Sequence, residues 1–161
     1  MGTAVRRLLF PLVVSALCAV LIGAASVRAV EWTDYEREAL PAVTALVAGD
    51  PAGFVAQAPA YGGSLLLRAP FALAADAAGG GPLAVFRALA APALLASVAL
   101  GLVLWSGLAR AGRTRAAWAA LGLAVLHPTA VRALETGHPE EVVGGALALG
   151  AVALALAGRP V

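Results

Sequence analysis

The chain has 161 residues, of which 61% are hydrophobic and 12% charged, and its net charge is +2. Soluble domains are about half apolar and about a quarter charged, so this composition indicates a membrane protein and excludes a disordered chain. So small a net charge gives no basis for nucleic-acid binding. The single cysteine, Cys18, lies in an apolar run and has no disulfide partner within the chain.

Four apolar segments approach or reach the roughly 20 residues that a membrane crossing needs. They are residues 8–27, 83–108, 116–134 and 142–157. The fourth is the shortest and would need flanking residues or local thinning of the bilayer. We therefore predict an all-α fold, a polytopic membrane helix bundle in which residues 1–161 form a single membrane domain.

The arginines set the predicted orientation of these segments. Every basic residue of the chain is arginine, and six of them lie in stretches without acid: Arg6, Arg7, Arg110, Arg113, Arg115 and Arg159. Because cytoplasmic loops are enriched in basic residues, we predict a multi-pass protein of the cell membrane with its N-terminus and the link 109–115 in the cytoplasm. The loops 31–82 and 135–141 then lie outside.

The first apolar segment has a second interpretation, a cleaved signal peptide. It has a basic start, and Val27-Arg28-Ala29 loosely fits a cleavage site. Its apolar run is longer than the roughly 7–15 residues of a typical signal peptide, which favours a membrane anchor. The loop 31–82 is outside in both cases.

The long outside loop is expected to contain helices of its own. Within residues 31–48, apolar side chains recur at helical spacing at Tyr35, Ala39, Val43 and Leu46. Residues 64–76 are apolar but too short to span, so we predict an interfacial or re-entrant helix there.

All nine carboxylates lie in the two stretches assigned to the outside: Glu31, Asp34, Glu36, Glu38, Asp50 and Asp76 in the first, and Glu135, Glu140 and Glu141 in the second. If the first stretch is extended, Asp34 and Glu36 share a face. If it is helical, Asp34 and Glu38 share one, with Glu31 beside them. Such a pair could hold a divalent cation or act as a general base. The simpler interpretation is a solvated helix start whose acids are favoured by the helix dipole.

The second acidic stretch is dense in polar groups. Pro139 suits the first turn of a helix, and the dipole of that helix alone would favour Glu140 and Glu141 near its start. Arg132 is expected to pair with Glu135 three residues further on, or to bind a lipid phosphate.

His127 lies deeper, within the third segment. Ionisable residues inside spans tend to face a cavity or the interior of a bundle, so structural and pathway-lining roles are both open for His127. Pro128 directly after it is expected to kink the helix.

The segments YGGSLLLRAPFALAA (residues 61–75) and RALETGHPEEVVGGAL (residues 132–147), with acids just after the first span, resemble a known family. They are similar to the C-type superfamily of integral-membrane glycosyltransferases, in its polyprenol-phosphate-dependent branch common in actinobacteria. The resemblance implies transfer of a hexose from a polyprenol-phosphate donor to an acceptor on the outer face. The lipid-linked sugar donor and membrane lipids are the implied partners.

The resemblance also implies roles for single residues. The resemblance implies that a first-loop Asp acts as the general base on the acceptor hydroxyl or helps to hold a divalent metal, which points to Asp34, with Glu36 second. His138, Glu140 and Glu141 match the second loop; His138 is the candidate for the donor phosphate, and the two glutamates are candidate ligands of a divalent cation, Mg or Mn.

Family members are longer and have more spans, so the chain is expected to be an N-terminal portion that is inactive by itself. Two alternatives come from other classes of protein. One is a small transporter-like protein that uses His127, Arg132 and the carboxylates as a polar path. The other is a non-catalytic membrane scaffold with solvated acidic loops.

Overall fold

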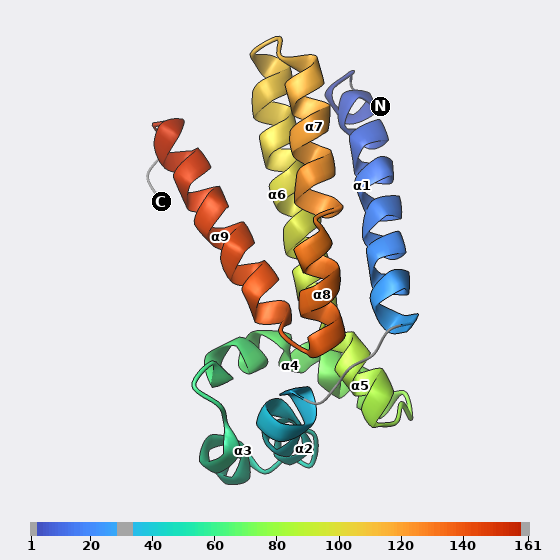
Figure 1. The fold of residues 1–161 in the computed structure, drawn as a ribbon, viewed down its shortest axis with the longest axis vertical. Helices are drawn as coiled ribbons and strands as arrows, with labels where there is room; N and C mark the ends of the chain where they lie inside the picture. Colours follow the sequence, from blue (N-terminus) through green and yellow to red (C-terminus); the bar gives the residue numbers. More distant parts are fainter. Residues whose placement is uncertain (1–2, 29–33, 159–161) are drawn as a thin grey trace.

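The computed structural model describes residues 3–28 and 34–158, and the regular elements of that part of the chain are all helical (Figure 1). They are α1 (Thr3–Arg28), the π-helical turn η1 (Tyr35–Ala39), α2 (Leu40–Val47), α3 (Pro51–Gln57), α4 (Gly62–Ala77), α5 (Pro82–Ala88), α6 (Ala91–Arg110), α7 (Thr114–Val125), α8 (Pro128–Thr136) and α9 (Pro139–Leu156). The predicted all-α helix bundle is confirmed.

The helices form a long bundle with a layer of short helices at one end. Helices α1, α6, α7 and α9 run along the long axis, and α8 continues in the direction of α7 (Figure 1). The short helices from η1 to α5, residues 34–88, gather at one end of the bundle, and we call them the end layer. The link between α6 and α7 lies at the opposite end, with Arg113 in it and Arg110 and Arg115 at the adjoining helix ends. The predicted outside stretches are therefore grouped together, away from the arginine-rich link.

Three helical stretches are long and apolar enough to cross a membrane: Pro82–Arg110, Thr114–Thr136 and Pro139–Leu156. They confirm three of the four predicted spans by length and composition. The last is longer than predicted because its helix already begins at Pro139. The first predicted span stays a prediction, since the described apolar part of α1, Leu9–Ala25, counts among the shorter apolar helices.

Prolines interrupt two of these stretches. Helix α5 ends at Ala88 and α6 begins three residues later, at Ala91. Pro92 has no N–H, so it cannot donate the helical hydrogen bond to the carbonyl of Ala88. Pro128 likewise cannot donate to the carbonyl of Ala124, and α7 ends at Val125. The helix is therefore interrupted at Pro128, as its position predicts, and the expected kink stays a prediction, because α8 continues in the direction of α7. The break between α5 and α6 was not predicted, because the apolar run there continues without a polar residue.

The end layer has a hydrophobic core of its own. Tyr35, Ala39 and Val43 are all buried, which confirms the helical spacing in this segment. They pack in one cluster with Leu65 of α4 and Phe86 of α5, among others. Each large side chain buried in this way contributes about 1.5–3 kcal/mol. This core fixes the start of η1 against α4 and α5.

An aromatic cluster lies in the arginine-rich half of the bundle. The ring of Trp118 contacts the rings of Phe10 and Trp105, with centroids 5.5 Å and 5.7 Å away. Tryptophan is enriched where a membrane meets water. This cluster is therefore suited to the membrane boundary nearest the link between α6 and α7.

Candidate functional site

The corner between α8 and α9 lies directly against the start of η1. Gly137 ends α8 with φ +94°, a conformation that favours glycine. A Cβ atom on Gly137 would lie only 2.8 Å from the Cβ of Tyr35, so a side chain here would push the two segments apart. This close approach brings the second acidic stretch beside the first.

Four charged or polar side chains form a continuous network across this contact. Nε2 of His138 lies 3.5 Å from Oδ2 of Asp34, and Nδ1 of the same ring lies 2.9 Å from Oε1 of Glu140. The other oxygen of Glu140, Oε2, lies 3.0 Å from Nη2 of Arg68. We call these four residues the charge network. It joins η1, α4 and α9.

Arg68 is the buried member of the charge network. Its side chain is 3% exposed, and it donates hydrogen bonds to the carbonyl and the hydroxyl of Ser64 as well as to Glu140. Burial lowers the pKa of Arg68, while the charge of Glu140 opposes that shift. An arginine starts so far above neutral pH that it stays charged here. The sequence placed Arg68 in an apolar segment and gave it no role.

Tyr61 extends the site toward a further carboxylate. Its hydroxyl donates a hydrogen bond to Oε2 of Glu38 at 2.9 Å, and its ring lies 6.2 Å from the ring of His138. Burial and the hydrogen bond to Glu38 raise the pKa of Tyr61 well above its usual range, so the phenol stays protonated and donates. No feature of the sequence indicated this pair.

The structure separates the predicted site residues into two groups. Asp34, His138 and Glu140 meet in the charge network. Glu36 is exposed and has no ion pair or hydrogen bond with the described residues, because the helical arrangement turns it away from Asp34. Glu31 lies outside the described residues.

The remaining two candidates lie elsewhere. Arg132 is 60% exposed at its side chain, and its Nη1 lies 3.7 Å from Oε2 of Glu135, which confirms the expected pair. Glu141 is exposed and lines a second cavity, on the side of α9 that faces α6 and α8.

The carboxylates of the site are mostly engaged by cations. Glu140 is bound by Arg68 and His138, so both of its oxygens already have partners. Among residues 3–28 and 34–158, the structure contains no group of three or more His, Cys, Asp or Glu side chains suited to hold a metal ion. A cation on Glu140 and Glu141 stays a prediction.

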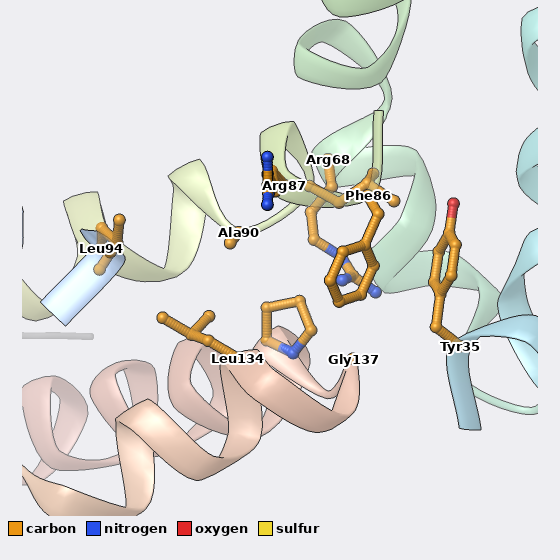
Figure 2. A pocket seen from close by; sticks show the side chains of 11 residues that line it. Tyr35, Arg68, Phe86, Arg87, Ala90, Leu94, Leu134 and Gly137 are labelled. Carbon is orange, nitrogen blue, oxygen red and sulfur yellow. The ribbon is translucent and has the colours of Figure 1, made fainter. Parts of the chain in front are cut away.

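A cavity of about 150 Å³ adjoins the charge network, and we call it the first cavity. Figure 2 shows Tyr35 and Arg68 at one end, with Leu94 and Leu134 toward the other. Arg87 of α5 also lines it. Burial raises the pKa of Tyr35 to about 12, so this phenol is neutral at physiological pH. The first cavity therefore has arginines in its lining beside the charge network and an apolar end that reaches into the bundle.

The charge network makes stability sensitive to the protonation of His138. Partial burial lowers the pKa of His138, but the hydrogen bond and charge of Glu140, followed by the hydrogen bond to Asp34, outweigh burial and raise it above 6.5. A raised pKa in the folded state means that the stabilisation is fully present below pH 6.5 and is lost as the pH rises through the raised value.

We therefore expect wild type to lose stability relative to His138→Gln as the pH rises above 6.5. The loss should be of the order of 1 kcal/mol or less, as for exposed ion pairs. Unfolding in detergent, followed by circular dichroism at several pH values, measures it. A His127→Gln variant, which alters the other histidine of the chain, should keep the wild-type dependence. A difference between wild type and His138→Gln that does not change with pH would contradict this account.

Comparison of the chain with protein-family models, with curated proteins and with solved structures found no match. Its function is therefore inferred from the chemistry of the charge network and the first cavity.

Proposed function

We propose that this chain supplies the base and the donor-binding cavity of a membrane glycosyltransferase, which moves a sugar from a polyprenol-phosphate donor to an acceptor on the outer face of the cell membrane. The observation that carries the proposal is the meeting of Asp34 with His138, Glu140 and Arg68, the last of which also lines the first cavity. In this proposal the arginine-rich link is cytoplasmic and the end layer lies outside.

Asp34 is the proposed general base. Its side chain is 47% exposed, so an acceptor hydroxyl can reach it, and His138 holds it from one side. As the acceptor oxygen bonds to the anomeric carbon, Asp34 takes the hydroxyl proton. The bond between the sugar and the phosphate breaks, and polyprenyl phosphate leaves with the electron pair.

The first cavity is the proposed site of the donor lipid. Arginine is suited to phosphate because its planar guanidinium offers several N–H donors in a fixed geometry. The hydrogen bonds of Arg68 to described residues use Nε and Nη2, which leaves Nη1 for a phosphate oxygen. Arg87 adds a second positive charge, and Leu94 and Leu134 provide an apolar surface for the first prenyl units.

The transporter alternative has weaker support. Within the described parts of the three candidate spans, His127 is the one ionisable residue far from a span end. A transport path needs polar groups in several spans at that depth. The transporter and scaffold alternatives stay predictions.

Binding of the donor tests the proposal without requiring turnover. Purified protein in nanodiscs is mixed with a short polyprenyl-phosphate hexose, and complex formation is followed by native mass spectrometry. Arg87→Gln should weaken binding roughly tenfold or more, the effect of one lost charge-assisted hydrogen bond. Arg113→Gln, a matched change in the link between α6 and α7, should leave it unchanged. Absence of binding by wild type, or equal binding by both variants, would overturn the proposal.

A further inference from the structure

A second cavity, of about 250 Å³, lies between α6, α7, α8 and α9, and we call it the second cavity. It is set among the three stretches that can cross a membrane. Helix α9 diverges from α6 and α7 toward its C-terminal end (Figure 1). Two leucines of the lining, Leu123 and Leu149, are 69% and 58% exposed, so the second cavity is open toward the surroundings of the bundle.

Four polar residues contribute to the lining of the second cavity. They are Ser97, His127, Thr129 and Glu141. Nδ1 of His127 is hydrogen-bonded to the hydroxyl of Thr129. The nine residues of α8 separate His127 from the corner at Gly137, a distance of about 13 Å along a helix. The lining thus places a histidine at a depth where an apolar side chain would be expected.

The backbone adds a further acceptor. Pro128 has no N–H for the carbonyl of Ala124, and Ala124 lines the second cavity. Irregular backbone at membrane depth is tolerated where it lines a cavity that can satisfy its polar groups. A ligand with a hydrogen-bond donor would satisfy this carbonyl.

The two cavities differ in the charge of the residues that line them. Two arginines line the first cavity, whereas the second has no arginine among its described lining residues and carries the carboxylate of Glu141. A phosphate would be repelled by that carboxylate. A hydroxyl both donates and accepts, so it can donate a hydrogen bond to Glu141 or to the carbonyl of Ala124 while accepting one from Thr129 or Ser97.

We propose that the second cavity binds the hydroxyl head of a neutral lipid alcohol, with its hydrocarbon chain along Leu100, Leu123 and Leu149. Polar groups that fix the head, within largely apolar walls, are typical of ligand sites. The inference concerns a different cavity from the donor site and holds whether or not the protein transfers a sugar.

Two adjacent glycines of α9 provide a matched pair of variants. A Cβ atom on Gly144 or on Gly145 would meet nothing within 4 Å, so both positions accept a larger side chain. Only Gly145 lines the second cavity. Gly145→Leu should therefore fill the second cavity, and Gly144→Leu adds the same side chain beside it.

Photocrosslinking distinguishes the proposal from general contact with lipid. The protein in nanodiscs is irradiated with a diazirine-labelled hexadecanol, or with its phosphate ester, and the labelled peptides are identified by mass spectrometry. Alcohol labelling of α7 to α9 should fall roughly tenfold or more in Gly145→Leu and stay unchanged in Gly144→Leu. His127→Phe, which removes the polar ring atoms but keeps the bulk, should abolish the preference for the alcohol.

Equal alcohol labelling of the two glycine variants would overturn the proposal, as would equal labelling by the phosphate ester in wild type. Labelling spread evenly over the exposed faces of α1 and α6 would mean that the probe contacts the bundle only as surrounding lipid. That result would also overturn the proposal. Circular dichroism of Gly145→Leu checks that the helices are retained. Binding of the polyprenyl-phosphate donor should be unchanged in Gly145→Leu, so failure at one cavity is separable from failure at the other.

Discussion

Replacing Asp34 by Asn should lower turnover of the lipid-linked donor by about 100-fold to 10,000-fold, the usual contribution of a general base. The amide of Asn has nearly the shape of the carboxylate and its oxygen can still face His138, but it cannot take a proton from the acceptor. Donor binding should persist, because Arg68 and Arg87 are untouched. Initial rates with a radiolabelled donor, in the full membrane system that supports transfer, separate the fall in kcat from any change in KM.

Two further variants make the result specific to Asp34. Asp76→Asn makes the same chemical change at an exposed position near the end of α4 and should leave turnover unchanged. Glu36→Gln tests the rival base. Loss of turnover in Glu36→Gln with full turnover in Asp34→Asn would move the role to Glu36. Undiminished turnover in both would remove the first acidic stretch from the chemistry.

Glu140→Gln should be the most destabilising single change in the site, with a cost of about 3–5 kcal/mol. The reason is that Arg68, whose side chain is 3% exposed, would remain charged and buried without its carboxylate. For a chain of this size the midpoint of thermal unfolding should fall by roughly 6–20 °C. Thermal unfolding in detergent, followed by circular dichroism, measures the change.

Removal of both charges provides the internal test of this explanation. The double variant Arg68→Met, Glu140→Gln should recover much of the loss, because replacing a buried ion pair by groups without charge is often close to neutral. The exposed control Asp76→Asn should stay within about 0.5 kcal/mol of wild type. A double variant as unstable as Glu140→Gln alone would show that the cost does not come from the uncompensated arginine.

The helices could be predicted where the sequence has a periodic or compositional signal. The spacing of apolar residues predicted which side of the helix is buried in the first outside stretch, at Tyr35, Ala39 and Val43. The position of Pro139 predicted the start of α9. The apolar lengths predicted three spans, and Pro128 predicted the interruption between α7 and α8. The break between α5 and α6 has no such signal besides Pro92, because residues 88–96 around it are all apolar.

The candidate site could be predicted only in part. The grouping of the carboxylates indicated that the two stretches meet, and the family resemblance pointed to Asp34, His138 and Glu140 among the candidates. It could not show that Arg68 neutralises Glu140, since the two residues are 72 positions apart and no local pattern relates them. The same holds for Tyr61 and Glu38, whose contact depends on how α2, α3 and α4 fold over one another. Pairings of this kind are set by the tertiary packing of the end layer.

The π-helical turn η1 makes chain length, besides residue identity, a determinant of the site. In η1 the N–H of Leu40 donates to the carbonyl of Tyr35, five positions back instead of the four of an α-helix. Deleting one residue from this turn would restore ordinary helical winding and rotate everything before it by about 100° relative to α2. Asp34 would then face away from His138 while the buried side of α2 kept its place. The one extra residue in the π-helical turn therefore orients the carboxylate of Asp34 toward His138. This stretch should tolerate substitution at exposed positions far better than a change in length.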